Sequence, residues 1–209
     1  MKLIAIKTPN SSEDAAFLDQ MYRLRSHVFA DRLAWDVSRA DGRERDQFDE
    51  YEPTYILALS DSDVVVGCAR LLRCVGPTML EKVFPQLLSA GRLVAHPTMV
   101  ESSRFCVDTA RPREAGEGAL HDVTLGMLAG ILEWCLHQGY REIATATDVR
   151  FERILRRAGW PMQRLGRPLL INETMSVAGL LPVSWEDFER VRPQTYRSAF
   201  GPQRQRTAA

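Results

Sequence analysis

The segment from Gly118 to Gln138 restricts the fold more than any other part of the chain. Its apolar residues recur at helical spacing, and further leucines widen the apolar stripe until little polar surface remains. The repeating positions are Leu120, Val123, Met127, Ile131 and Trp134, and the stripe is widened by Leu125, Leu128 and Leu132. A helix with so little polar surface is stable only when other elements cover it, so we expect a buried central helix.

Strands and amphipathic helices alternate on both sides of this helix in the sequence. An N-cap pattern at Ser11-Ser12-Glu13-Asp14 opens a helix, and two apolar runs separated by Asp61-Ser62-Asp63 predict a hairpin. Strands are expected at 3–6, 54–60, 64–72, 99–107, 141–147, 163–171 and 173–180, with helices at 79–84, 148–158 and after Ser184. This order predicts an α/β fold, a three-layer α-β-α sandwich with a mixed central sheet.

The length of 209 residues fits one domain, which we expect to span residues 1–200 and to end in a flexible polar tail at 201–209. Residues 33–53 are rich in charge and aromatic rings but lack periodicity. A connection of that length within a compact domain usually carries function.

Composition excludes several classes of protein. Lys+Arg and Asp+Glu number 27 each, so no net charge attracts a nucleic-acid backbone. Charged residues interrupt the apolar runs before the ~20 residues needed to cross a bilayer. The four cysteines are widely spaced, the four histidines lack ligand spacing, and no charged-then-apolar leader opens the chain. We expect a cytoplasmic protein with reduced thiols and without a metal or other cofactor.

A glycine string lies between the expected strand at 99–107 and the central helix. It reads Arg113-Glu114-Ala115-Gly116-Glu117-Gly118 and resembles the acyl-CoA-binding motif of the N-acetyltransferase superfamily. Glycines there let backbone amides approach a phosphate at the start of a helix, so Arg113, Gly116 and Gly118 are candidate donor-binding residues. The alternative is a polar loop that enters a helix.

A second series of motifs is spread over the first half of the chain. In order it comprises Arg25-Ser26-His27-Val28-Phe29, Trp35, Asp46-Gln47-Phe48-Asp49, Arg70, Phe84 and Glu101-Ser102-Ser103-Arg104-Phe105. The series resembles the autoinducer synthase family, the N-acyl-homoserine-lactone synthases of bacterial quorum sensing. The resemblance implies an N-acetyltransferase-like fold. It also implies transfer of an acyl group from a thioester to the amino group of S-adenosylmethionine, with lactone closure and release of methylthioadenosine.

This reaction requires a base. The α-amino group has a reference pKa of about 7.7–8.0 and must lose a proton before it attacks the thioester. A carboxylate does this directly or through water. The matching family glutamate makes Glu101 the candidate base, with Ser103 and Arg104 beside it in the catalytic group. The alternative is a structural ion pair between Glu101 and an arginine.

The same resemblance assigns the substrate-binding residues. Asp46 and Asp49 are expected on one side of a turn, where their family counterparts hold the cationic substrate and a mobile N-terminal loop, here near residues 33–53. The guanidinium groups of Arg25, Arg70 and Arg104 suit the methionine carboxylate, or they form an ion-pair network with the acids. The aromatic side of the site is assigned to Phe29, Trp35, Phe84 and Phe105.

Two further features concern the acyl donor. Thr145 matches the threonine of family members that prefer a 3-oxo chain, where its hydroxyl donates to the extra carbonyl; Thr147 is the alternative position. The basic helix at 148–158 suits the acidic face of acyl carrier protein through Arg150, Arg153, Arg156 and Arg157. The glycine string favours acyl-CoA, so the donor stays open between the two.

Two other functions fit parts of the sequence. A generic acetyl-CoA-dependent N-acetyltransferase explains the glycine string and the fold but not the series from Arg25 to Asp49. A non-catalytic sensor would bind acyl thioesters or adenosyl ligands in the same cleft, but the intact acids and arginines argue against it.

Overall fold

The computed structural model describes residues 1–33, 35–108, 117–197 and 200, with side chains described outside 117–121. The elements are β1 (Lys2–Ile6), α1 (Ser12–Arg25), the π-helix η1 (Ser26–Arg32), β2 (Arg39–Ala40), β3 (Arg43–Glu44), the 3-10 helix η2 (Gln47–Glu50), β4 (Thr54–Leu59), β5 (Val65–Arg73), α2 (Met79–Val83), the 3-10 helix η3 (Pro85–Leu87), β6 (Met99–Val107), α4 (Glu117–His137), β7 (Glu142–Asp148), α5 (Val149–Arg157), β8 (Gln163–Arg164), β9 (Leu169–Ile171), β10 (Thr174–Pro182) and α6 (Trp185–Val191).

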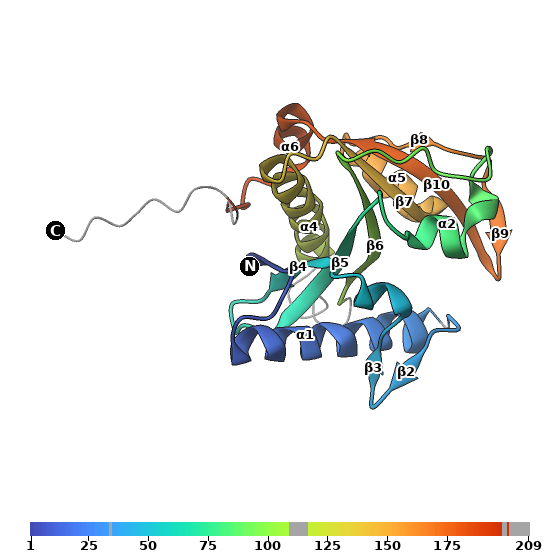
Figure 1. Cartoon of the computed structure of the whole chain (residues 1–209). Helices are drawn as coiled ribbons and strands as arrows, with labels where there is room; N and C mark the ends of the chain where they lie inside the picture. The colour runs from blue at the N-terminus through green and yellow to red at the C-terminus, as the bar shows by residue number, and fades with distance from the viewer. Residues whose placement is uncertain (34, 109–116, 198–199, 201–209) are drawn as a thin grey trace.

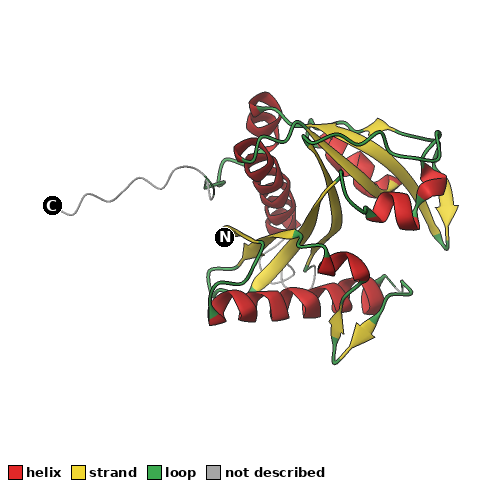
Figure 2. Ribbon diagram, viewed as in Figure 1, coloured by secondary structure: helices red, strands yellow, loops and turns green. Residues whose placement is uncertain are grey.

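In the described part of the chain, eight of these strands form one sheet (Figure 1). The order is β1-β4-β5-β6-β7-β10-β8, with β9 paired to β10. Strands β6 and β7 are parallel, whereas the other described neighbours are antiparallel. Helices lie on both sides of the sheet (Figure 2), which confirms the predicted mixed sheet between two helical layers.

Alternation along β4 separates two cores. Tyr55, Leu57 and Leu59 face α1 and pack with its buried residues. Ile56 and Ala58 point to the other face and pack against α4. Because both faces of the strand are covered, all six residues of β4 are buried.

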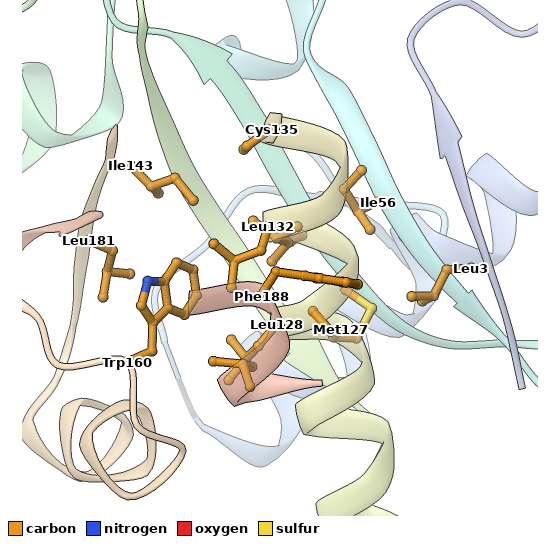
Figure 3. Close-up of a cluster of buried hydrophobic side chains, with 14 of the residues drawn as sticks. Leu3, Ile56, Met127, Leu128, Leu132, Cys135, Ile143, Trp160, Leu181 and Phe188 are labelled. Atoms are coloured by element: carbon orange, nitrogen blue, oxygen red, sulfur yellow. The ribbon is translucent and has the colours of Figure 1, made fainter. Parts of the chain in front are cut away.

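The larger core surrounds α4, as predicted from its apolar sequence (Figure 3). Leu128 and Leu132 of α4 meet Trp160 and Phe188 from the chain beyond β7. The indole nitrogen of Trp160 donates to the carbonyl of Pro182 at 2.8 Å, so this large ring is buried with its polar atom satisfied. None of the helices in the described segments has the length and apolarity to cross a bilayer.

Three local expectations were wrong. The helix that starts after Ser11 does not stay α-helical, because residues 26–32 wind as a π-helix. The single strand predicted at 163–171 is two short strands, β8 and β9. The expected loop at 33–53 contains the β2–β3 hairpin and η2. Each difference depends on tertiary contacts that local periodicity does not encode.

Candidate active site

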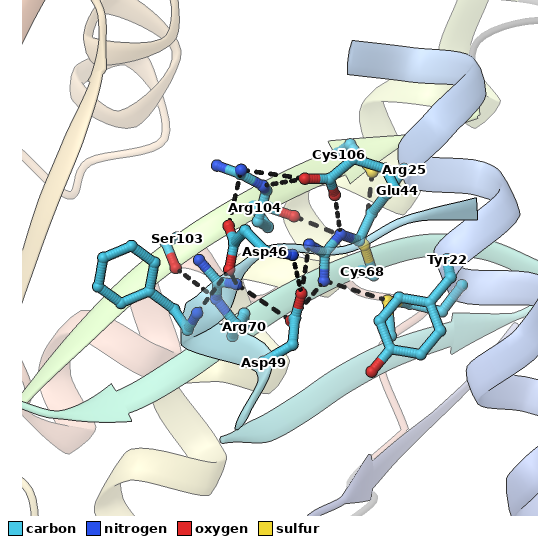
Figure 4. Close-up of polar contacts among 12 residues, drawn as sticks. Tyr22, Arg25, Glu44, Asp46, Asp49, Cys68, Arg70, Ser103, Arg104 and Cys106 are labelled. Atoms are coloured by element: carbon cyan, nitrogen blue, oxygen red, sulfur yellow. Dashed lines mark hydrogen bonds and ion pairs between the residues drawn. The ribbon is translucent and has the colours of Figure 1, made fainter. Parts of the chain in front are cut away.

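A buried cluster of charged side chains lies where α1 meets the β2–η2 segment and the sheet (Figure 4). Arg25, in the last turn of α1, is fully buried. Its Nε donates to Glu44 Oε2 at 2.5 Å, while Nη1 and Nη2 donate to the two carboxylate oxygens of Asp49 at 2.8 and 2.9 Å. This bidentate pairing fixes the guanidinium plane.

The two predicted acids, Asp46 and Asp49, form a capping box around η2. The Asp46 carboxylate accepts from the Phe48 amide at 2.8 Å, and the Asp49 carboxylate accepts from the Asp46 amide at 2.9 Å. The three-residue spacing therefore brings both carboxylates together, as expected.

Arg70 joins these acids to the sheet. Its Nη1 donates to Asp46 Oδ1 at 2.5 Å and to Asp49 Oδ1 at 3.0 Å, and its Nε donates to Ser103 Oγ at 3.1 Å. The side chain of Arg70 is completely buried. Five of the predicted residues are thus in one hydrogen-bonded network: Arg25, Asp46, Asp49, Arg70 and Ser103.

A bulge in β6 completes the cluster. Cys68 pairs with Cys106 and Arg70 pairs with Ser103, so β6 contains one residue more than β5 over this interval. The extra residue lets Ser103 and Arg104 both reach the same side of the sheet, and Arg104 takes a φ of 52°. Such a left-handed backbone is strained in a residue with a side chain.

The bulge directs Arg104 at two acids. Its Nη2 lies 3.0 Å from Glu44 Oε1 and 2.7 Å from Asp46 Oδ2. The contact with Asp46 lacks hydrogen-bond geometry, and Asp46 Oδ2 is a buried oxygen without a hydrogen bond from the described residues. Asp46 therefore keeps capacity for a donor on a bound ligand.

Charge is balanced within the cluster, because three carboxylates face three guanidinium groups. Burial opposes ionisation of Asp49, but hydrogen bonds from Arg25 and the charges of Arg25 and Arg70 outweigh it, and the pKa of Asp49 lies well below its ordinary value. The carboxylate therefore stays ionised at neutral pH.

Glu101 lies next to this cluster and has different partners. Its two carboxylate oxygens accept from the backbone amides of Met79 at 2.8 Å and Leu80 at 2.6 Å, at the start of α2. Burial raises the pKa of Glu101, although these amide hydrogen bonds oppose the shift. The carboxylate is held by a helix terminus rather than by the arginine partner considered from the sequence.

Three residues of the site were missed by sequence reasoning. The Tyr55 hydroxyl donates to Asp49 Oδ1 at 2.7 Å. Glu44 is fully buried and binds both Arg25 and Arg104. Met79 accepts from Arg104 Nη1 at 3.2 Å and from Arg70 Nη2 at 3.6 Å through its sulfur. The available signal for Glu44 was its position in the acid- and arginine-rich stretch before Asp46, whereas nothing local distinguishes Met79.

A cavity of about 1600 Å³ borders this cluster. On the α1 and α2 side of the sheet it is lined by Asp46, Glu101, Ser103 and Arg104 together with aromatic rings; on the α4 and α5 side it is lined by Leu128, Ile131, Thr145, Leu155 and Trp160. The pairing of β6 with β7 ends at Ser102 and Thr145. We conclude that the cavity passes through the sheet where these two strands separate.

Aromatic residues border the charged side of the cavity. Phe29 stacks on Trp35 with ring centroids 5.2 Å apart, and the Arg104 guanidinium lies over the Phe29 ring. Phe84 also lines the cavity, and Phe105 contacts Phe151 of α5. All four predicted aromatic residues therefore border the same cavity.

Thr145 lines the cavity too, but its hydroxyl already donates to the Ser102 carbonyl at 2.9 Å. Donation to a substrate requires rotation away from that carbonyl. Thr147 lines the same cavity two residues further along β7.

The predicted donor-binding residues lie elsewhere. The four arginines of the basic helix are exposed on α5, whose Phe151, Ile154 and Leu155 line the cavity instead. Gly118 lies in the first turn of α4. Arg113 and Gly116 fall outside the described residues. Within the described residues, no three His, Cys, Asp or Glu side chains are grouped to hold a metal ion.

Known proteins match this chain along nearly its whole length. The acyl-homoserine-lactone synthase of Rhizobium radiobacter is 55% identical over 198 residues, which cover 95% of this chain and 93% of that protein. The solved structure of BjaI, a CoA-dependent acyl-homoserine lactone synthase with SAM and isopentyl-CoA, matches with a TM-score of 0.81 and 27% identity, covering 94% of this chain and 92% of that one.

A more distant match concerns the fold alone. A Lactobacillus plantarum protein assigned as an N-acetyltransferase aligns with a TM-score of 0.57 and 17% identity, covering 88% of this chain and 98% of that one. The predicted N-acetyltransferase-like architecture is thereby confirmed. The sequence model of autoinducer synthases matches residues 10–191. The chain therefore belongs to the autoinducer synthase family of acyl-homoserine-lactone synthases.

Proposed function

We propose that this protein transfers an acyl group from a thioester to the α-amino nitrogen of S-adenosylmethionine. The methionine carboxylate then attacks its own γ-carbon, the bond from that carbon to sulfur breaks, and methylthioadenosine leaves as the lactone closes. The observation that carries this proposal is one cavity with a charged side and an apolar side that meet where β6 and β7 separate.

The charge of the site complements this substrate. S-adenosylmethionine has a sulfonium, an ammonium and a carboxylate, so its net charge is positive. The charges of the carboxylates and arginines in the cluster cancel, and Glu101 adds a negative charge beside them. A cation is therefore favoured over a neutral amine on this side of the cavity.

Two groups of the cluster are suited to contact the substrate directly. Asp46 lines the cavity, and its Oδ2 accepts no hydrogen bond from the described residues, so this carboxylate suits the substrate ammonium. Among the described residues, Arg104 Nη1 has only the thioether of Met79 as an acceptor, and a thioether is a weak one. The methionine carboxylate is a stronger acceptor and would displace it. Arg25 and Arg70 are fully buried and hold the acids in place.

Glu101 is the proposed base. The raised pKa of Glu101 reduces the difference between its pKa and that of the substrate amino group. Glu101 is therefore a better proton acceptor than an ordinary glutamate. The side chain borders the cavity but is only 1% exposed, so transfer through one water fits its position. The two amides of α2 fix the direction of the carboxylate during the transfer.

The remaining surfaces of the cavity suit the adenosyl group of one substrate and the acyl chain of the other. The Phe29–Trp35 stack offers a flat apolar face for the adenosyl group. Leu128, Ile131 and Trp160 on the α4 and α5 side suit the acyl chain, and Phe105 lies near the junction.

We propose acyl carrier protein as the donor. Arg153, Arg156 and Arg157 are exposed and have no ion pair with any described residue. By contrast, Arg190 on α6 and Arg192, which follows α6, are paired with acids of that helix. Unpaired arginines beside the cavity are available for an acidic protein surface.

A product assay tests both proposals. Purified protein is incubated with S-adenosylmethionine and either acyl carrier protein or CoA thioesters of the same chain, and products are identified by mass spectrometry. We expect lactone and methylthioadenosine in equal amounts, with a higher kcat/KM for the carrier-protein thioester. Higher kcat/KM with CoA would overturn the donor assignment alone. An acetylated amine without methylthioadenosine would overturn the proposed reaction.

A further inference from the structure

Two thiols lie side by side beneath the charged cluster, and the proposed reaction uses neither. Cys68 on β5 and Cys106 on β6 are partners in the antiparallel register, and their sulfur atoms are 3.4 Å apart. Both side chains are buried, with 1% and 4% exposure. The other two cysteines, Cys74 and Cys135, lie in separate core clusters.

This geometry is close to that of a disulfide. Opposed residues of antiparallel strands have Cα atoms about 4.5 or 5.5 Å apart, within the range that a disulfide spans. The sulfur atoms must approach by about 1.4 Å to reach the bond length of roughly 2.05 Å. Small rotations of the two side chains accomplish this without a change of register.

Cys106 also borders the substrate cavity, which gives a small oxidant a route to the pair. We propose that Cys68 and Cys106 form a reversible disulfide under peroxide and that its formation lowers the turnover of the enzyme. The Cys106 sulfur attacks one peroxide oxygen, the O–O bond breaks, and a sulfenic acid and water form. Cys68 sulfur then attacks Cys106 sulfur, and a second water leaves as the disulfide closes.

Disulfide formation affects turnover through the bulge in β6. Arg104 lies two residues before Cys106, and Arg70 lies two residues after Cys68. The Cys68 thiol donates to the Arg104 carbonyl at 3.5 Å, and this hydrogen bond is lost when the thiol proton leaves. Closure therefore removes a hydrogen bond that supports the strained Arg104 backbone, within the strand segments that position both arginines.

The reaction should be slower than that of an exposed thiol. The hydrogen bond with Cys68 and burial both raise the pKa of the Cys106 thiol, so little thiolate is present at neutral pH. The experiment accordingly uses excess hydrogen peroxide over hours, with a non-reducing peptide map and an activity assay at each time.

Wild type is compared with Cys68→Ala and with the matched control Cys135→Ala, which removes a buried thiol from another cluster. We expect a peptide linking Cys68 to Cys106 in wild type and in the control, with turnover reduced about fivefold or more and restored by dithiothreitol. Peroxide should not lower the turnover of Cys68→Ala below that of the same variant without peroxide. Cys68→Ser replaces it if the alanine variant unfolds.

Three results would overturn the proposal: no linked peptide in wild type, a linked peptide with unchanged turnover, or equal loss of turnover in Cys68→Ala. Because the linked peptide is detected without any assay of activity, failure here is distinguishable from failure of the proposed function.

Discussion

The two sides of the cavity are organised by different forces. On the α1 and α2 side, each charged side chain of the buried cluster has partners at hydrogen-bond distance, and the direction of each group is fixed by its neighbours. On the α4 and α5 side, Leu128, Ile131 and Trp160 pack by shape and volume. Directional contacts suit a substrate whose charges are always the same, whereas apolar packing suits an acyl chain whose length varies.

The largest effect is expected from a substitution that breaks the buried charged cluster. Asp49→Ala removes the partner of two buried arginines, so the free energy of unfolding should fall by about 3–5 kcal/mol. Urea denaturation measures this loss. The matched control is Asp19→Ala, which breaks solvent-accessible ion pairs with Arg23 and Arg43 and should cost much less. Similar losses in both variants would show that the buried cluster is not a special source of stability.

The second largest effect distinguishes a role of Glu101 as the base from a role in holding α2 in place. Glu101→Gln removes the base, so kcat should fall by about 100-fold or more. Thr78→Ala removes the N-cap of α2 and leaves the carboxylate in place, so it tests the contact between α2 and Glu101 alone. We expect this control to keep kcat within about threefold of wild type. An equal fall in both variants would assign Glu101 to holding α2.

A smaller effect is expected on the apolar side. Leu128→Phe reduces the space for the acyl chain, so the preferred chain should shorten and kcat/KM for the longest accepted chain should fall about tenfold. Leu132→Phe, one turn along in the core, is the control for overpacking. Competition assays with mixed chain lengths measure the preference, and KM for S-adenosylmethionine should not change. An unchanged preference in Leu128→Phe would place the chain elsewhere.

The smallest effect is the dependence of stability on pH, where the two buried acids act in opposite directions. The lowered pKa of Asp49 gives stability that is present above its unfolded pKa of about 3.9 and is lost as the pH falls further. The raised pKa of Glu101 makes its ionisation unfavourable to the fold, so its contribution improves as the pH falls from neutral toward about 4.3.

Denaturation series from neutral pH to pH 3 test this difference. We expect Glu101→Gln to flatten the curve above about pH 4.3, and Asp49→Asn to flatten it below about pH 3.9. Curves parallel to wild type in both variants would contradict the assigned pKa directions.

Sequence reasoning reached the fold because its signals are local, and the family resemblance identified part of the cavity lining. The apolar stripe of α4, the spacing of Asp46 and Asp49, and the strand at Met99–Val107 all depend on neighbouring residues. Contacts between distant segments were not predictable in this way. Glu44 is recognisable as buried only once Arg25 and Arg104 approach it from 19 and 60 residues away.

The same limit explains the partners of Glu101. The sequence suggested an arginine, because acids and arginines are the polar residues of the motif. The structure instead brings the first amides of α2 against the carboxylate, 21 and 22 residues away. Backbone donors have no residue type by which they are recognised, so only the path of the chain reveals them.

The central claim is that the substrate amine and the acyl carbonyl meet between the two sides of the cavity, beside Glu101. A crystal structure with S-adenosylmethionine and a non-hydrolysable acyl thioester analogue tests this most directly. We predict the amino nitrogen within about 2.6–3.2 Å of Asp46 and one water from Glu101, with the acyl chain on the α4 and α5 side. An amine bound on the α4 side, or an acyl chain lying among the arginines, would contradict the account.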